Sequence, residues 1–273
     1  EAEIAGEKAG ILKPSIPVVM GRLRAEAAEV VRARAEVIGA KVISLGEHFA
    51  VDYTPEVIGA NAFRFSEKNS SAGGTFEMDA VVSMPGRAAR ENAGLAIACV
   101  RALQVHAADA FREAARIGLA QCELPARIEI LRHDSEVIVD AAHTAESARL
   151  LAEALGVLAP NGYELILSVS SDKNFEALLA ALLPGAHRVW LTKAEPTRSL
   201  AIDVMADRVR ALAPNLAIET VENPELAARR ARAELAEGLR LCAAGSIYLA
   251  GIVRRVLGEA DERSESESAP ARS

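Results

Sequence analysis

The sequence has few cysteines, and the three that it has form no pattern. Cys99, Cys122 and Cys242 lie far apart and make no Cys-x-x-Cys pair and no Cys/His group with the spacing of metal ligands. Neither a disulfide framework nor a structural zinc site is therefore predicted. This cysteine usage suits a reducing compartment, so we expect a cytoplasmic protein.

Long apolar runs and an excess of positive charge are also missing. No stretch approaches the roughly 18 residues that a membrane-spanning helix needs, and no charged segment followed by an apolar one opens the chain. The net charge is -7, which gives no support for binding to nucleic acid or to an anionic membrane. We expect a small-molecule partner instead.

Familiar catalytic and nucleotide-binding motifs are absent in their complete forms. The chain contains no GxGxxG, no GxxxxGK[ST] and no GxSxG, so a complete phosphate-binding loop and a Ser-His-Asp hydrolase are not predicted. His48, His106, His133 and His187 are scattered, and each is interpreted as a surface or core histidine rather than a ligand.

What the sequence does contain is the composition of a globular α/β protein. Of its 273 residues, 51% are hydrophobic and 25% are charged, and the length favours two domains. The chain begins with Glu1 inside a helical pattern that has no cap. We interpret this as a piece cut from a longer protein.

The first half, residues 1–123, has a mixed pattern. An apolar run ending at Gly21, a helical pattern ending at Gly39 and the segment "KVISLG" predict a strand-helix-strand unit. Residues 48–84 alternate around the turn-forming "KNSSAGG", which predicts antiparallel strands, and two amphipathic helices follow.

The second half, residues 124–258, alternates strands and helices regularly, and this predicts a mainly parallel sheet covered on both faces. The polar segment 259–273 is predicted to be a disordered tail. The expected strands are 136–142, 163–170, 188–194, 216–222 and 239–245, and the expected helices are near 145–156, 174–183, 201–212, 223–237 and 246–257.

Polar or glycine residues follow four of the expected strands. Ligands of open α/β sheets bind at the carboxyl ends of the strands, and helix N-termini there favour anions, so these corners are expected to converge on one binding edge. A plainer alternative is ordinary loop chemistry, in which Asp140 and Thr144 only cap the next helix. The corner residues are Asp140 and His143; Ser170, Ser171, Asp172 and Lys173; Lys193 and Glu195; and Gly245 and Ser246.

Five segments carry a family resemblance in their order and spacing. They are "GEKAGILKPSIPVVMG", "MPGRAARENAGLAIACVRAL", "LPARIEILRHDSEVIVDAAHTAESARLLAEAL", "SVSSDKNF" and "AAGSIYL". This ordered set, from Glu1 to about Leu257, resembles the folylpolyglutamate synthase and dihydrofolate synthase family, relatives of the Mur ligases.

The resemblance implies a fold and a reaction. The fold is the remainder of a Mur-ligase-type ATPase domain, with a mixed sheet and helices, followed by a Rossmann-like, mainly parallel α/β domain. The reaction is an ATP- and Mg²⁺-dependent ligation, in which a carboxylate of folate or dihydropteroate becomes an acyl phosphate and the amino group of L-glutamate attacks it. A monomer is implied.

The resemblance also implies roles for single residues. Lys8 in "GEKAGI" matches a family lysine that is carbamylated and lies near the metal site. Asn92 and Arg127 match positions that contact ATP, Asp140 matches an aspartate at the nucleotide, and His143 matches a histidine that faces the acyl phosphate and glutamate. If so, alanine at Asp140 or His143 is expected to abolish activity of a complete enzyme with little change in melting temperature.

Thr144 stands where the family has an asparagine, so the position of the substrate glutamate near this residue stays open. Thr144 can still cap the helix. Ser171, Asp172, Lys173 and Ser246 are implied as glutamate-side residues.

The family's phosphate-binding loop, most magnesium ligands and most folate contacts precede the "EKAGI" segment. The chain alone is therefore expected to have negligible ligase activity. Two alternatives remain: a non-catalytic nucleotide- or glutamate-binding module, and a Mur-type ligase for another acceptor.

Overall fold

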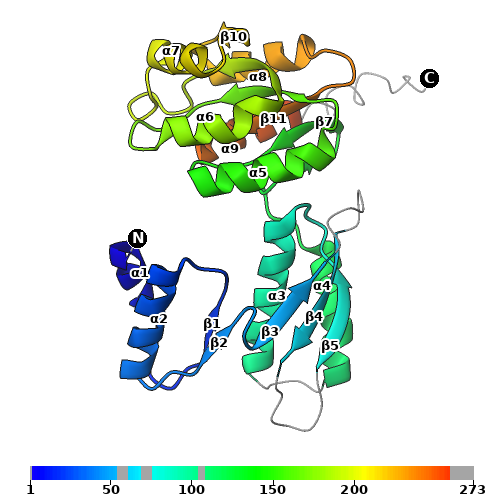
Figure 1. Cartoon of the computed structure of the whole chain (residues 1–273). Coiled ribbons are helices and arrows are strands. Elements are labelled where there is room, and N and C mark those ends of the chain that lie inside the picture. The colour runs from blue at the N-terminus through cyan, green and yellow to red at the C-terminus, as the bar shows by residue number, and fades with distance from the viewer. Residues whose placement is uncertain (1, 54–60, 69–75, 104–107, 259–273) are drawn as a thin grey trace, which may run out of the picture. The chain divides into compact units, whose positions relative to one another are not determined.

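The structure is a computed structural model that describes residues 2–53, 61–68, 76–103 and 108–258. The chain forms two compact units, which are described separately (Figure 1). Unit 1 comprises Glu1–Ser83 and Arg87–Glu123, and unit 2 comprises Met84–Gly86 and Leu124–Ser273. The predictions for His106, for most of the "KNSSAGG" turn and for the tail 259–273 lie outside the described residues.

Unit 1 begins with a strand-helix-strand arrangement, as predicted. After helix α1 (Ala2–Ala9), strands β1 (Val18–Met20) and β2 (Val42–Ser44) pair in parallel, and helix α2 (Ala25–Val37) connects them. Gly39 follows α2 with φ +66°, a left-handed conformation that glycine adopts without steric cost and that commonly ends helices.

The rest of unit 1 is an antiparallel sheet with two helices. Strands β3 (Phe49–Asp52), β4 (Ala62–Glu67) and β5 (Glu77–Val81) pair in that order, which confirms the predicted antiparallel strands. Strand β5 alternates exposed and buried residues, as a strand with one face in the core does. Helices α3 (Arg87–Ala102) and α4 (Ala108–Gln121) complete the unit (Figure 1).

Unit 2 is built on a six-stranded sheet with the order β10-β9-β8-β11-β7-β6. Five strands are parallel, and β6 pairs antiparallel with β7 at one edge. The five parallel strands match the predicted ones, whereas β6 was not predicted. The strands are β6 (Glu129–Leu131), β7 (Asp134–Val139), β8 (Tyr163–Leu167), β9 (Ala186–Leu191), β10 (Ala217–Thr220) and β11 (Arg240–Ala244).

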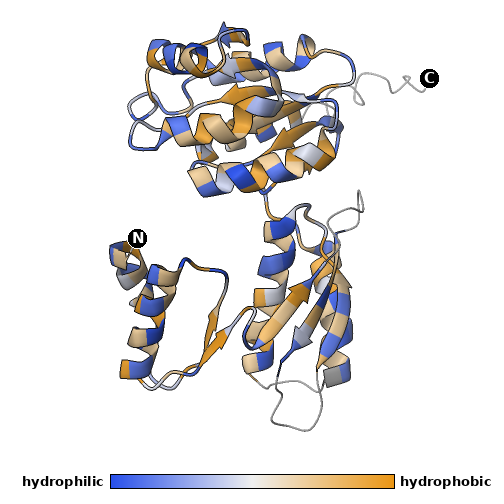
Figure 2. Ribbon diagram, in the orientation of Figure 1, coloured by the Kyte–Doolittle hydropathy of each residue, from blue (hydrophilic) through white to orange (hydrophobic). Residues whose placement is uncertain are grey.

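Helices cover both faces of this sheet, as predicted. Helices α5, α6 and α7 share one apolar cluster with the sheet, and α8 and α9 share another on the opposite face. Hydrophobic colour fills the strands while the helices are two-sided, which fits a sheet buried on both faces (Figure 2). The helices are α5 (Ala145–Leu158), α6 (Phe175–Leu182), α7 (Ile202–Leu212), α8 (Pro224–Ala233) and α9 (Ile247–Gly258), with a 3₁₀ turn at Leu183–Gly185.

Helix α8 ends at Ala233, earlier than the predicted residue 237. Strand β11 must begin at Arg240 beside Tyr163, and the intervening residues turn the chain back to that position. None of the helices in the described part of the chain has the length and apolar character needed to cross a membrane.

Candidate functional site

The predicted polar corners of unit 2 lie along one edge of its sheet. Strands β7, β8, β9 and β11 run parallel, so the residues that follow them share the carboxyl edge. Arg127 joins this edge for a different reason. It precedes the antiparallel strand β6, whose Glu129 pairs with Val139 near the end of β7. The structure therefore brings Arg127 beside Asp140.

Asp140 is a buried backbone anchor. Its side chain accepts hydrogen bonds from the N–H of Ile128 (2.7 Å) and the N–H of Ala142 (2.7 Å), and the residue is only 6% exposed. Asp140 does not cap α5, so the simple capping alternative is wrong for this residue. Its carboxylate instead ties the start of β6 to the end of β7.

Burial and its neighbours act in opposite directions on the ionisation of Asp140. Desolvation raises the pKa of this carboxyl above its ordinary value, and the two backbone N–H donors and the nearby charges of Arg127 and His143 oppose that rise. The effect of both charges on its pKa indicates that Arg127 and His143 lie within electrostatic reach of Asp140.

Arg127 is exposed between two buried neighbours in an unusual backbone. Ala126 has φ +55° and Ile128 has φ +49°, while their side chains are 6% and 7% exposed. A left-handed conformation costs a non-glycine residue about 1–2 kcal/mol and is a genuine outlier for a β-branched residue such as Ile128. The surrounding contacts must therefore hold the backbone around Arg127 in place.

The ring of His143 is oriented by its own backbone. Its Nδ1 lies 2.9 Å from the carbonyl oxygen of Ala141. A carbonyl can only accept, so Nδ1–H is the donor. In the neutral ring this leaves the Nε2 lone pair available, and the residue is exposed. The imidazole can thus accept a proton at Nε2.

Thr144 caps helix α5, as predicted. Its hydroxyl accepts from the N–H of Ser147 (3.2 Å), and the Ser147 hydroxyl accepts in return from the N–H of Thr144 (3.0 Å). This reciprocal capping box satisfies N–H groups at the helix start that would otherwise lack partners.

The corner after β11 is held close to the same residues. Gly245 has φ +99°, and its N–H donates to the carbonyl of Ala142 (2.7 Å). A Cβ atom at Gly245 would stand only 2.4 Å from the carbonyl oxygen of Ser168, so a larger residue does not fit. Ser246 is 6% exposed, directly precedes α9, and accepts a hydrogen bond from the N–H of Tyr248 (3.2 Å).

The corner after β8 carries a lysine close to an aspartate. Lys173 Nζ lies 2.9 Å from an Asp172 oxygen, and this hydrogen bond holds the pKa of Asp172 below its ordinary value. The N–H of Ser171 donates to the carbonyl of Arg198 (2.9 Å), and the hydroxyl of Ser170 donates to Glu195 (3.1 Å). The loop after β9 therefore braces this corner.

Two serines of this edge were not predicted. The Ser168 hydroxyl accepts from the N–H of Ala194 (2.9 Å) and lies 3.2 Å from the Ser199 hydroxyl. Ser168 has no solvent exposure. These contacts join segments about thirty residues apart in the chain, so no local sequence pattern predicts them. Lys193, which was predicted, lies 3.9 Å from Glu222.

Lys8 and Asn92 belong to unit 1, and the other predicted site residues belong to unit 2. Lys8 is exposed in the last turn of α1, with its Nζ 3.2 Å from Glu7, and Asn92 is exposed on α3. Among the described residues, no group of three or more His, Cys, Asp or Glu side chains could hold a metal ion. The described residues thus do not form a complete magnesium site.

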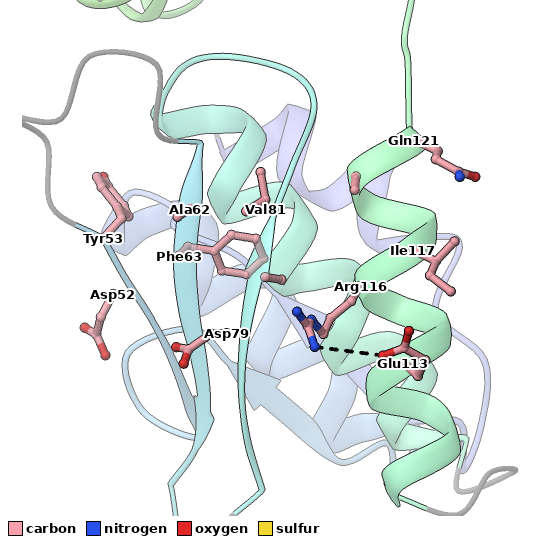
Figure 3. Close-up of a pocket in the computed structure, with 12 residues that line it drawn as sticks. Asp52, Tyr53, Ala62, Phe63, Asp79, Val81, Glu113, Arg116, Ile117 and Gln121 are labelled. Atoms are coloured by element: carbon pink, nitrogen blue, oxygen red, sulfur yellow. Dashed lines mark ion pairs between the residues drawn. The ribbon is translucent and has the colours of Figure 1, made fainter.

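Unit 1 contains a cavity of about 670 Å³ between the antiparallel sheet and α4 (Figure 3). Tyr53, Phe63, Val81 and Ile117 contribute to its lining, and Arg116 lies 3.9 Å from Glu113 at its wall. None of the predicted site residues lines this cavity. The cavity is therefore distinct from the carboxyl edge in unit 2.

The segment that contains this edge is similar to a known domain family. Residues 126–247 match the family "Mur ligase, glutamate ligase domain". The chain is 31% identical over 208 residues to the dihydrofolate synthase/folylpolyglutamate synthase of Bacillus subtilis, covering 74% of this chain and 46% of the relative. It is 29% identical to the corresponding Mycobacterium tuberculosis protein, covering 94% and 56%.

A solved structure is similar over nearly the whole chain. The crystal structure of Mycobacterium tuberculosis folylpolyglutamate synthase with ADP and AMPPCP aligns with a TM-score of 0.78 at 29% identity, covering 94% of this chain and 60% of that one. The chain thus spans about half the length of the curated relatives it matches.

Residues 126–247 are thus similar to the glutamate ligase domain of the Mur ligases. Within that superfamily, the chain fits the folylpolyglutamate synthase/dihydrofolate synthase family, and the predicted fold and family are confirmed.

Proposed function

We propose that this chain provides the glutamate ligase domain and part of the ATP-binding domain of an ATP-dependent ligase that adds L-glutamate to a folate, to dihydropteroate or to both. The observation that carries the proposal is the convergence of Arg127, His143, Lys173 and Ser246 on one sheet edge within a glutamate ligase domain. That edge offers helix N-termini, a guanidinium, an ammonium and an imidazole to an anionic intermediate.

In the proposed reaction, a carboxylate oxygen of the acceptor attacks the γ-phosphorus of ATP, and ADP leaves. The nitrogen of glutamate then attacks the acyl carbon, a C–N bond forms, and the C–O bond to phosphorus breaks with release of inorganic phosphate. The departing phosphate takes up the second N–H proton, which the nitrogen loses as the amide forms. The ammonium group of glutamate must first lose one proton, because a protonated nitrogen cannot attack. His143 can accept it, because Ala141 holds Nδ1–H and leaves Nε2 as the basic atom.

The other residues bind and orient. Arg127 donates charge-assisted hydrogen bonds to phosphate oxygens, and Asn92 in unit 1 supplies amide hydrogen bonds to ATP. Lys173 provides a positive charge for a carboxylate of the substrate glutamate. To bind it, Lys173 leaves its ion pair with Asp172.

Ser171 and Asp172 complete the corner after β8, and Ser246 that after β11. Asp140 acts at the nucleotide through the backbone that it anchors beside Arg127.

Magnesium is part of the proposal as the ion that neutralises phosphate oxygens when bound. Lys8 relates to it only indirectly, as a carbamate that would add a carboxylate-like group. We further propose that the protein is a cytoplasmic monomer. It binds neither nucleic acid nor anionic membranes, because its net charge is -7.

The test is glutamate-dependent release of ADP by the complete gene product, with tetrahydrofolate and dihydropteroate as alternative acceptors. His143→Ala is expected to lower kcat by at least about 100-fold, the usual contribution of a positioned acid or base. His133→Ala is the matched control, because His133 lies in the exposed turn between β6 and β7, at the opposite edge of the sheet.

Three results would contradict the proposal. Equal kcat in the His143→Ala and His133→Ala variants would remove His143 from the chemistry. Binding of ADP without turnover of either acceptor would favour the non-catalytic binding module, and turnover with a different acceptor would favour another Mur-type ligase.

A further inference from the structure

The backbone around Arg127 is held by three hydrogen bonds from three directions. The N–H of Ile128 donates to Asp140 (2.7 Å), the carbonyl of Ala126 accepts from the N–H of Ala141 (3.0 Å), and the N–H of Ala126 donates to Glu129 (2.7 Å). These bonds compensate for the two left-handed residues. They also fix the direction in which the exposed Arg127 leaves the backbone.

Glu129 is the member of this set that no motif singles out. Its Oε2 accepts from the N–H of Ala126 and also from Nε of Arg254 on α9, at 2.6 Å. The two side chains are 23% and 39% exposed, so the ion pair is partly shielded from solvent. Arg254 thereby orients and charge-balances the carboxylate that holds the turn.

Arg254 links two parts of the proposed site. It stands on the same helix that begins after Ser246, and through Glu129 it reaches the turn that presents Arg127. Loss of the Glu129 carboxylate would leave the N–H of Ala126 without its acceptor in a buried position. The left-handed backbone could then relax, and the position of the Arg127 guanidinium would no longer be fixed.

We propose that Glu129 and Arg254 are positioning residues that hold Arg127 in the geometry that binds phosphate oxygens. The inference deepens the proposed function and rests on it, because it takes Arg127 as a phosphate contact. A guanidinium in the wrong position still attracts phosphate by its charge. It cannot form the aligned, charge-assisted hydrogen bonds that make arginine–phosphate pairs strong.

The test compares binding of ADP by calorimetry in the complete gene product and its variants. Arg127→Ala and Glu129→Ala are each expected to weaken ADP binding about tenfold, the loss of roughly one charge-assisted contact. Glu129→Gln keeps an oxygen acceptor for the N–H of Ala126 and is expected to retain affinity within about threefold. Arg255→Ala is the matched control, because Arg255 neighbours Arg254 but pairs with Glu225 (2.7 Å).

A double-mutant cycle separates positioning from general damage to the fold. In the Arg127→Ala background, Glu129→Ala is expected to cause no further loss of ADP affinity, because the residue acts through Arg127. A melting curve for each variant shows whether it is folded at the assay temperature, and Glu129→Gln provides the milder change if Glu129→Ala is not.

The outcomes distinguish this inference from the proposed function. If Glu129→Ala weakens ADP binding equally with and without Arg127, or leaves it unchanged while Arg127→Ala weakens it, the positioning role is wrong and the phosphate role of Arg127 stands. If the wild-type protein binds no ADP, or Arg127→Ala binds it normally, the proposed nucleotide contact itself fails.

Discussion

Replacement of Asp140 by alanine is predicted to destabilise unit 2, in contrast to the expectation from sequence that it would affect activity alone. The carboxylate accepts the N–H groups of Ile128 and Ala142, and both residues are almost fully buried, at 7% and 2% exposed. Each buried donor left without an acceptor costs about 1–3 kcal/mol. The two together predict a loss of roughly 2–6 kcal/mol in the free energy of unfolding.

Thermal and urea unfolding, followed by circular dichroism, measure this loss. A domain of this size shifts its melting temperature by about 2–4 °C per kcal/mol, so a drop of roughly 4–24 °C is expected. Asp140→Asn is expected to fall between wild type and alanine, because its amide oxygen can accept one N–H while its NH₂ faces the other donor.

His143→Ala is the control for the same corner. The ring is exposed and makes its contact with the adjacent backbone, so its loss is expected to change stability by no more than about 0.5 kcal/mol. If Asp140→Ala unfolds within about 0.5 kcal/mol of His143→Ala, the anchoring role of Asp140 is refuted.

Three further predictions concern the same edge. Ala126→Gly is expected to be neutral, or to raise the free energy of unfolding in urea by up to about 1 kcal/mol, because glycine removes the left-handed strain. Ala236→Gly is the control and should be destabilising, because Ala236 lies in an exposed loop and has no positive φ. Equal effects of the two substitutions would contradict strain at Ala126. By NMR, the Asp172 carboxyl should titrate below the ordinary value of about 3.9, and Lys173→Ala should move its pKa upward; no movement would exclude Lys173 as the cause. Gly245→Ala should lower stability by more than about 2 kcal/mol in the same unfolding assay, given its positive φ and the close carbonyl, and a normal melting curve would contradict that contact.

The strands and helices of unit 2 could be predicted from the sequence because the patterns that indicate them are local. Alternating apolar strands and amphipathic helices recur along unit 2, and each buried strand is followed by turn or cap residues. Thr144 could be assigned as a cap from its position alone. Strand β6 could not be predicted, because Glu129–Leu131 is recognised as a strand by its pairing with β7.

The details of the site depended on tertiary contacts that no pattern encodes. The left-handed Ala126 and Ile128 carry no glycine signal, and Asp140 bonds a backbone group twelve residues earlier in the chain. Sequence placed Asp140 at the right edge but could not separate ligand contact from backbone support. The structure adds Glu129 and Arg254, which act on Arg127 from β6 and α9.

The roles of the glutamate-side residues and of Lys8 and Asn92 stay predictions. Lys173, Ser171 and Ser246 lie at the carboxyl edge of unit 2, where a glutamate ligase domain is matched. Substitutions scored for KM of glutamate test the first three, and mass spectrometry of intact protein at neutral pH tests carbamylation of Lys8.

The proposed chemistry is tested most directly by following oxygen through the reaction. The acceptor carboxylate is labelled with heavy oxygen, and the inorganic phosphate released by the complete gene product with ATP and glutamate is analysed by mass spectrometry. An acyl-phosphate intermediate transfers one labelled oxygen to phosphate, because the carboxylate oxygen bound to phosphorus leaves with it when the amide forms. Phosphate that carries no label while amide product accumulates would contradict the proposed acyl-phosphate mechanism.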